Sequence, residues 1–297
     1  MLSGSFRLNL QINTLAHNMV VFPNAKINLG LNVISKRTDG FHDIESVFLP
    51  VPWTDILEVV ENKKYNVGQP KINLKLSGIE IPGSPEGNLC VKAFRLLDSS
   101  FDLPPLTIFL HKLIPMGAGL GGGSSDAAFF LKLMNEKFRL GLTHPQLMNY
   151  AIKLGSDCAF FLTNKPAHIA GKGEKIVPID VGQKFIHYKV LIVYPSLLVP
   201  TVDAYRGIIP AIPHQPGLEI VLNTPLINWK ENLKNDFEPV IFHQFPEIME
   251  VKRLLYKHGA TYASMSGSGS AVYGLFEKNT PDIDNLFPAD YLIWKNE

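Results

Sequence analysis

The segment PMGAGLGGGSSDAAFF, residues 115–130, combines five glycines and two serines with the start of an apolar helical pattern. Each glycine in an ordered backbone costs about 0.5–1 kcal/mol relative to alanine, so a glycine run needs a reason. Backbone amides of a glycine-rich loop at a helix N-terminus form an anion site, because unpaired N–H groups converge there and the helix dipole adds positive potential. We therefore expect this loop to bind phosphate, with Ser124 and Ser125 placed to contact it or a phosphate-bound Mg²⁺.

Other nucleotide-binding motifs do not explain this loop. Gly117, Gly119 and Gly122 satisfy GxGxxG, but the dinucleotide fold also needs a second parallel strand that ends in an acidic residue about 20 residues later. Here a helical pattern continues past Glu136 and is followed by a second helix. The Walker A motif and the protein-kinase glycine loop with its HRD segment are absent from the sequence. A phosphate loop of another type remains, or a glycine loop that binds nothing.

Alternating strands are predicted around this loop. In KINLGLNVI, from residue 26, four aliphatic side chains occupy one face of a half-buried strand, which puts Lys26 and Asn28 together on the other face. Further alternations around residues 72–76 and 108–110 predict a small sheet in the same half of the chain.

Two helices are predicted after the glycine run. Apolar residues recur at helical spacing over residues 127–138, with Ser124 or Ser125 as the N-cap. A capping box formed by Thr143 and Gln146 begins a second helix, which Gly155 ends. Asp157 follows directly, in what we expect to be a short connection.

The composition and hydrophobic pattern of the sequence change beyond residue 171. Residues 189–194 read as a buried strand, residues 207–230 are rich in proline and loop residues, and an apolar helical pattern spans residues 248–255. A chain of 297 residues favours two domains. We predict an N-terminal domain over residues 19–180, a C-terminal domain over 181–297, and an extension over 1–18.

Composition excludes several classes of protein. Hydrophobic residues at 46% and charged residues at 19% are ordinary for a globular chain, and a net charge of +1 without a basic block does not indicate nucleic-acid binding. Apolar runs are too short to span a membrane. Cys90 and Cys158 form no CxxC pair and the histidines form no HExxH motif, so we expect no protein-bound metal, no disulfide and a cytoplasmic location.

Three segments together resemble the GHMP kinases, which phosphorylate small molecules. PMGAGLGGGSSDAA is similar to the phosphate loop of that family, PNAKINLGL at 23–31 to its first motif, and SGSGSAVYGLF at 266–276 to its third. The resemblance implies a two-domain α+β fold with ATP, Mg²⁺ and substrate in the interdomain cleft. It assigns ATP-phosphate binding to Pro115, Met116, Gly117, Ala118, Gly119, Leu120, Gly121, Gly122, Gly123, Ser124 and Ser125, and a third glycine loop to Gly267, Ser268 and Gly269.

One segment narrows the resemblance within the family. KRTDGFHDIES at 36–46 is similar to the RxDGYH segment of the GHMP kinases that act on 4-diphosphocytidyl-2-C-methyl-D-erythritol in non-mevalonate isoprenoid synthesis. This implies transfer of the ATP γ-phosphate to the 2-hydroxyl of the methylerythritol group. A mevalonate- or homoserine-type kinase and a catalytically silent sensor of the same fold are the alternatives, and the chain is expected to be a monomer or a homodimer.

The same resemblance assigns two catalytic side chains. Asp157 matches the catalytic aspartate, which accepts the hydroxyl proton, and Lys26 matches the lysine that keeps this carboxylate ionised and stabilises the attacking oxygen. Without the motifs, a solvated acid and a solvated strand end would be the ordinary interpretations.

Further residues are assigned to the substrates. His42 is expected to read the cytosine edge, Phe41 to pack in place of the usual tyrosine without its hydroxyl, and Tyr205 to stack on the base. Asn28 is expected to face the substrate, although a structural asparagine remains an alternative, as a core or surface aromatic does for Tyr205. Asn88 and Lys112 are weaker candidates for nucleotide contacts.

Overall fold

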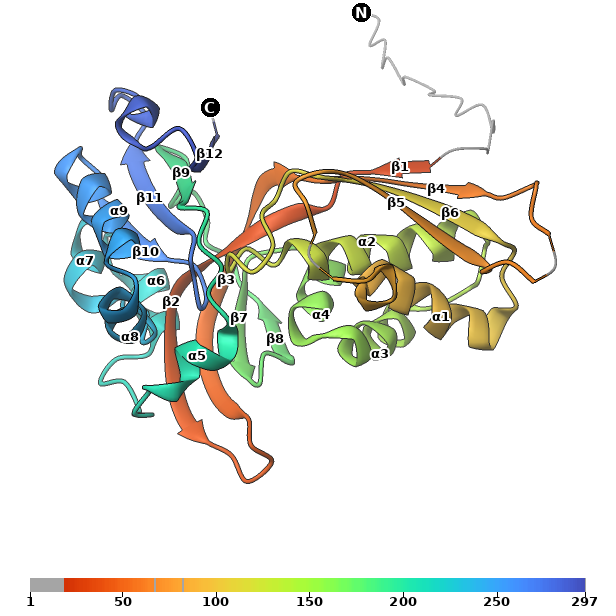
Figure 1. The fold of residues 1–297 in the computed structure, drawn as a ribbon. Helices are drawn as coiled ribbons and strands as arrows, with labels where there is room; N and C mark the ends of the chain where they lie inside the picture. Colours follow the sequence, from red (N-terminus) through yellow and green to blue (C-terminus); the bar gives the residue numbers. More distant parts are fainter. Residues whose placement is uncertain (1–18, 67, 82, 297) are drawn as a thin grey trace, which may run out of the picture.

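The computed structural model describes residues 19–66, 68–81 and 83–296. It consists of three four-stranded sheets and the helices packed on them (Figure 1). The predicted extension over residues 1–18 lies outside the described residues. Almost all strand pairs are antiparallel, the pair of β5 with β6 being parallel. Sheets and helices are both abundant, as expected for an α+β protein.

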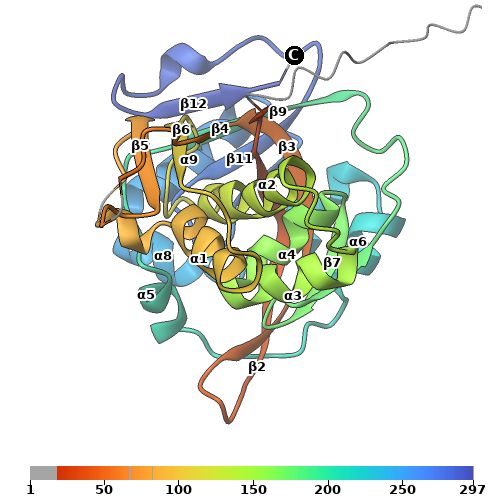
Figure 2. The same cartoon turned by 90° about the vertical axis from the view of Figure 1, so that its right-hand side faces the viewer.

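The first sheet carries four helices on one face (Figures 1 and 2). Alternate aliphatic residues of its strands point into a core that they share with the apolar faces of these helices. The strands, in spatial order, are β1 (Met19–Val21), β4 (Ile56–Glu61), β6 (Leu106–Lys112) and β5 (Ile72–Gly78). The helices are α1 (Leu89–Phe101), α2 (Gly122–Lys137), α3 (His144–Leu154) and α4 (Ser156–Thr163).

A second sheet is built on two long strands that run through the middle of the molecule (Figure 1). They are β2 (Asn24–Lys36) and β3 (His42–Thr54), extended by β7 (Ala167–Gly171) and β8 (Lys175–Pro178). We expected the strand that begins near Lys26 to be half buried, and this was wrong. Lys26 and Asn28 are buried as fully as the aliphatic face, because the phosphate loop covers their side of β2.

The third sheet lies on the opposite side of β2 and β3 from the first (Figure 1). Its order is β10 (Tyr262–Met265), β11 (Val272–Glu277), β9 (Tyr188–Tyr194) and β12 (Leu292–Lys295). Five helices accompany it: α5 (Thr201–Arg206), α6 (Gly217–Asn223), α7 (Trp229–Asn232), α8 (Glu238–Gln244) and α9 (Pro246–Lys257). The strand over 189–194 and the helix over 248–255 are confirmed, whereas the proline-rich stretch 207–230 contains α6 and α7 in addition to loops.

The cores of the second and third sheets are continuous. Aliphatic residues of β2 and β3, such as Ile27 and Val47, pack with residues of β9 and β11, such as Ile192 and Leu275. The predicted boundary near residue 180 falls between β8 and β9 and stays a prediction. Within the described residues, no helix has both the length and the apolar character needed to cross a bilayer.

Two local predictions around the glycine run are corrected. The helix begins at Gly122 with Gly121 at the N-cap, not Ser124 or Ser125, because Gly121 in the left-handed region (φ 71°) turns the chain into the helix earlier. The capping box of Thr143 and Gln146 is confirmed at the start of α3. Asp157 does not lie in a simple connection: Gly155 ends α3, and α4 begins at the next residue, which places Asp157 in its first turn.

Candidate active site

A central cleft is lined by residues from several separate segments. β2 and β3 form its floor, the glycine run before α2 forms one wall, and Asp157, α5 and residues 267–268 complete it. Every residue predicted in the phosphate loop lines this cleft, with the exception of Leu120 and Ser125. The cleft therefore joins the three motifs that are far apart in the sequence.

The phosphate loop is held from both sides by backbone hydrogen bonds. The amide of Lys26 donates to the carbonyl of Leu120 at 3.0 Å, and the amide of Ala271 donates to the carbonyl of Ala118 at 3.1 Å. Gly117, Gly119 and Gly121 all adopt positive φ values, which only glycine reaches without strain. The side chain of Leu120 is fully buried and anchors the loop in the core, so this residue offers the site only its backbone.

The two serines that follow the loop have different environments. Ser124 lines the cleft, and its contact with phosphate stays a prediction. Ser125 is fully buried, its hydroxyl has no hydrogen-bond partner, and its amide donates to the carbonyl of Gly121 inside the helix. The prediction that Ser125 contacts phosphate is therefore corrected: the helix starts early enough to turn this side chain inward.

Lys26 brings a buried ammonium group to the mouth of the loop. Its Nζ donates to Asn28 Oδ1 at 2.7 Å and to the carbonyl of Gly119 at 3.0 Å, and it lies 4.4 Å from the centroid of the Phe48 ring. Burial lowers the pKa of the Lys26 amine, and the nearby Asp157 carboxylate opposes that shift. The side chain is 4% exposed, so its charge acts in a medium that screens weakly.

Asp157 faces Lys26 across the cleft. Its Oδ2 lies 3.5 Å from Lys26 Nζ, and about a third of its side chain is accessible, at 31%. The two predicted catalytic side chains thus meet beside the phosphate loop, one buried and one open to the cleft. Such a pair can receive a proton from a hydroxyl group and stabilise the oxygen that loses it.

The third glycine loop presses directly against the phosphate loop. Gly267 and Ser268 line the cleft, whereas Gly269 does not. A Cβ atom on Gly119 would lie 1.8 Å from the carbonyl oxygen of Ser266, and one on Gly267 would lie 3.3 Å from Gly119 Cα. The two loops can approach this closely only because neither carries a side chain at the contact.

Sequence analysis missed the side chains that hold this loop contact. Ser266 donates from Oγ to the carbonyl of Gly119 at 2.8 Å, and Asn235 Nδ2 donates to the carbonyls of Met265 and Gly267, both at 2.8 Å. Both side chains are buried. The one sequence signal was the polar run Lys234–Asp236 between Leu233 and Phe237, but nothing local connects it to residue 267.

His42 and Tyr205 form an aromatic pair at the α5 side. Their rings are stacked, with centroids 4.6 Å apart and planes 18° apart, and Tyr205 lines the cleft. Phe41 is 58% exposed and does not line the cleft; Lys172 Nζ lies 4.8 Å from its ring centroid. The expectation that Phe41 packs into the site is corrected, because it belongs to the exposed turn between β2 and β3.

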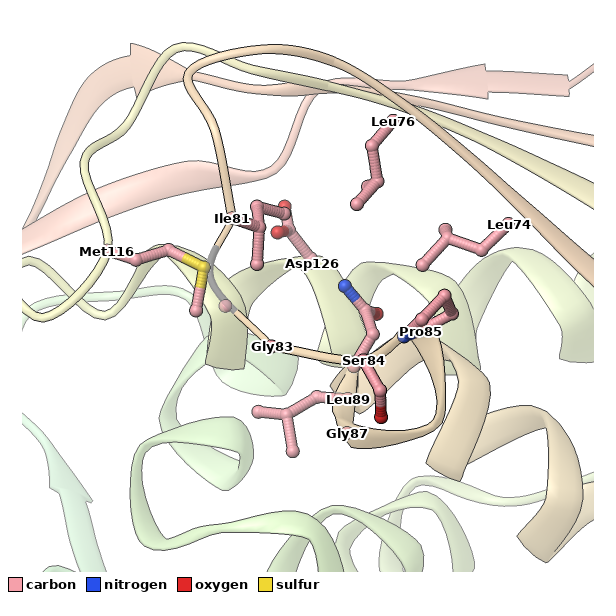
Figure 3. Close-up of a pocket in the computed structure, with 12 residues that line it drawn as sticks. Leu74, Leu76, Ile81, Gly83, Ser84, Pro85, Gly87, Leu89, Met116 and Asp126 are labelled. Atoms are coloured by element: carbon pink, nitrogen blue, oxygen red, sulfur yellow. The ribbon is translucent and has the colours of Figure 1, made fainter.

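A second pocket shares lining residues with the cleft, and Figure 3 shows the side chains around it. Leu89, Met116 and Gly123 line both hollows. The remainder of the second pocket is mostly apolar, with Leu74, Leu76, Ile81 and Pro85 around it. Asn88 also lines it, as expected for a nucleotide contact, and its Oδ1 caps α1 by accepting from the Cys90 amide at 2.9 Å.

Lys112 does not reach either pocket. It is completely buried, and its Nζ is bonded to Asp55 Oδ2 and, at 2.7 Å, to Asp126 Oδ2. Asp55 also accepts from the amides of Leu113 at 2.6 Å and Ile114 at 2.9 Å. The prediction of a direct nucleotide contact by Lys112 is corrected: the side chain points inward beneath the start of α2, where the two aspartates need a counter-charge.

The charged groups of this buried cluster have shifted pKa values. Burial, together with Asp55, raises the pKa of the Asp126 carboxyl to about 7, although Lys112 lowers it. Burial by itself would lower the pKa of Lys112, but the two aspartates together raise it. Among the described residues, Asp126 Oδ1 finds no hydrogen-bond partner. In the part of the chain that the structure describes, no three His, Cys, Asp or Glu side chains gather closely enough to hold a metal ion.

Two family models match segments of this chain. The family models for the GHMP kinases N terminal domain and the GHMP kinases C terminal domain match residues 88–165 and 222–285. The first match contains the phosphate loop and Asp157, and the second contains Phe237, Gly267 and Ser268. The cleft is therefore lined by residues from both matched domains.

Curated relatives cover almost the whole chain. A 4-diphosphocytidyl-2-C-methyl-D-erythritol kinase from Bacteroides fragilis is 50% identical over 87% of this chain and 92% of its own length. An enzyme of the same name from Parabacteroides distasonis is 43% identical over 94% of this chain and 99% of its own length.

Solved structures give the same fold. A crystal structure of 4-(cytidine 5'-diphospho)-2C-methyl-D-erythritol kinase superposes with a TM-score of 0.71 at 32% identity, covering 86% of this chain and 90% of that one. A homoserine kinase from Cytophaga hutchinsonii superposes with a TM-score of 0.64 at 16% identity, over 91% of this chain and 89% of that one. The second likeness concerns the fold alone.

Proposed function

The chain belongs to the GHMP kinase family, and we propose that it transfers the γ-phosphate of ATP to the 2-hydroxyl of 4-diphosphocytidyl-2-C-methyl-D-erythritol. This phosphorylation is a step in isoprenoid precursor biosynthesis by the non-mevalonate route. The observation that carries the proposal is the meeting of Lys26 and Asp157, 3.5 Å apart, at the mouth of the phosphate loop. The relatives with 43–51% identity supply the substrate class.

We assign ATP to the two hollows, which share lining residues. Its phosphates lie along the glycine loop, where the amides before α2 and the positive end of that helix face the cleft. The adenine takes the mostly apolar second pocket, where Asn88 offers polar groups and Met116 lies at the junction. The lining side chains of this pocket suit a flat aromatic ring.

Mg²⁺ would arrive with the nucleotide. The oxygen donors that line the cleft, Ser124 and the partly exposed Asp157, are of the hard type that Mg²⁺ prefers. When bound, the ion neutralises charge on the phosphate oxygens.

The reaction then needs a proton acceptor and a cation, both of which are present. The Asp157 carboxylate takes the proton of the substrate hydroxyl while that oxygen bonds to the γ-phosphorus, and the bond from this phosphorus to the β-phosphate oxygen breaks to leave ADP. Lys26 orients Asp157 and stabilises the negative charge that develops on the attacking oxygen. General-base assistance of this kind contributes about 10²- to 10⁴-fold in rate.

The cytidyl end of the substrate is assigned to the His42 and Tyr205 side of the cleft. A neutral imidazole offers one donor and one acceptor to the edge of a pyrimidine, and Tyr205 offers a stacking face. We place the reaction in the cytoplasm, in keeping with the two free buried cysteines, Cys90 and Cys158. A monomer and a homodimer are both compatible with this mechanism.

Phosphate transfer from labelled ATP tests the proposal. The protein is incubated with 4-diphosphocytidyl-2-C-methyl-D-erythritol, mevalonate or homoserine, and Asp157→Asn serves as the control. We expect transfer to the cytidyl compound alone, with ATP affinity of the variant within a few-fold of the wild type and most of its turnover lost. Transfer to another alcohol would contradict the substrate, and ATP binding without any transfer would favour a sensor. Unchanged turnover in the variant would exclude Asp157 as the base.

A further inference from the structure

A chain of hydrogen bonds runs from a β-bulge to the ammonium group of Lys26. Ser46 Oγ donates to the carbonyl of Gly30 at 2.6 Å, and Asn28 Nδ2 donates to Ser46 Oγ at 3.0 Å. Asn28 Oδ1 in turn accepts from Lys26 Nζ at 2.7 Å. Ser46 and Asn28 are 2% and 1% exposed, so water does not compete for these bonds.

The bulge explains why Ser46 is needed. The pairing register of β2 with β3 shifts between Leu29 and Leu31, and Gly30 lies at the shift with φ +70°. A Cβ at Gly30 would lie 2.5 Å from Leu233 Cδ1, so no side chain fits there. The register skips Gly30, and the hydroxyl of Ser46, which is paired with Leu31, satisfies the carbonyl of Gly30.

The bulge also determines which group donates and which accepts in each hydrogen bond between Ser46 and Lys26. A carbonyl can only accept, so the single hydroxyl hydrogen of Ser46 goes to Gly30. Ser46 can then only accept from Asn28, and only the NH₂ group of that side chain can donate. The carbonyl oxygen of the Asn28 amide must therefore face Lys26. The reversed amide would place two donors against an ammonium group.

The neighbouring Ser266 also contacts Asn28. Its Oγ donates to the carbonyl of Gly119 at 2.8 Å, lies 3.4 Å from Asn28 Oδ1 and accepts from the backbone amide nitrogen of Asn28 at 3.3 Å. Lys26 thus faces three acceptors, namely Asn28 Oδ1, the Gly119 carbonyl and Asp157 Oδ2. These match the three hydrogens of an ammonium group.

We propose that Ser46 is a positioning residue of the phosphoryl-transfer site, which fixes the Asn28 amide so that its oxygen holds Lys26 beside Asp157. Ser46 itself touches neither substrate. The inference rests on the proposed function. It assigns to the KRTDGFHDIES segment a second task, because its last residue connects β3 to the catalytic lysine.

Kinetics of Ser46 variants test this role. We expect Ser46→Ala to lower kcat about 10- to 100-fold, the loss associated with a hydrogen bond to a charged group, with KM for both substrates within about 3-fold. Ser46→Thr, which keeps the hydroxyl, should recover most of kcat. Should Ser46→Ala not fold, Ser46→Cys replaces it, because a thiol is a weak donor, and the expectation is the same.

A double-mutant cycle separates positioning from general damage. In an Asn28→Ala background, Ser46→Ala should change kcat by less than about 2-fold, because its effect passes through Asn28. The control is Ser264→Ala, which removes another buried serine hydroxyl, bonded to Glu238 Oε1 at 3.1 Å outside the cleft. Unchanged kcat in Ser46→Ala, independent effects in the cycle, or an equal loss in Ser264→Ala would each overturn the inference.

A spectroscopic readout keeps the inference distinct from the proposed function. The side-chain amide signals of Asn28, identified by their loss in Asn28→Ala, should shift in Ser46→Ala and not in Ser264→Ala. A wild-type protein that transfers no phosphate would overturn the proposed function, while this signal would still decide the role of Ser46. An unshifted Asn28 signal would overturn that role.

Discussion

The rings of His42 and Tyr205 stack on each other, with centroids 4.6 Å apart, although one begins β3 and the other lies in α5. Tyr205 also meets the Phe237 ring edge-on at 4.8 Å. The residues assigned to base reading and base stacking therefore form one aromatic surface next to the cleft.

Substitution of His42 tests the cytidyl assignment. We expect His42→Ala to raise KM for the cytidyl substrate at least about 10-fold and KM for ATP by less than about 3-fold, since a lost hydrogen bond and a lost stacking partner act on one substrate only. Steady-state kinetics with each substrate varied in turn measures both constants. Equal increases for the two substrates would contradict the assignment.

Contact between the two glycine loops is tested at Gly119. The Gly119→Ala change adds a Cβ that would lie 1.8 Å from the Ser266 carbonyl oxygen, so we expect the third loop to be displaced and ATP turnover to fall by more than about 10-fold. Gly141→Ala is the matched control: its φ of +70° resembles the +77° of Gly119, but no atom lies within 4 Å of the added Cβ. Comparable turnover losses in both variants would attribute the effect to backbone strain.

Lys112 is expected to be essential for stability. Removing it in Lys112→Met leaves Asp55 and Asp126 buried without their cation, and breaking a buried ion pair in this way costs about 3–5 kcal/mol. Urea unfolding measures the loss. Lys71→Met is the comparison, because Lys71 also bridges two aspartates, Asp98 and Asp102, but lies 30% exposed where water screens the charges. A similar loss in both variants would contradict the assigned role of burial.

Asp126 is expected to make stability depend on pH. Its pKa of about 7, raised chiefly by burial from an ordinary value of 3.8, means that between about pH 4 and pH 7 the folded chain keeps a proton that the unfolded chain has released. The free energy of unfolding therefore falls as pH rises through this range. We expect the decrease between pH 5 and pH 8, measured by urea unfolding, to be smaller in Asp126→Asn. An identical decrease in the variant would argue against this titration.

Local patterns in the sequence predicted several features of the strands, loops and helices around the cleft. The period of two placed Lys26 and Asn28 on one face, and the structure joins them by a hydrogen bond. The glycine run before a helical pattern predicted a turn into a helix, which is the start of α2, and Thr143 with Gln146 predicted the start of α3. These features depend on backbone geometry and on neighbours within a few residues, which is why the sequence alone reveals them.

Contacts between residues far apart in the sequence depend on the tertiary structure. The inward turn of Lys112 depends on Asp55, 57 positions away, and the links of Ser266 to Asn28 join residues 238 positions apart. No periodicity connects such residues, because their contact arises from the packing of whole strands and loops. The resemblance of the motifs named Lys26 and Asp157, but their distance, their unequal burial and the chain of donors through Ser46 follow from how β2, α4 and the two glycine loops pack together.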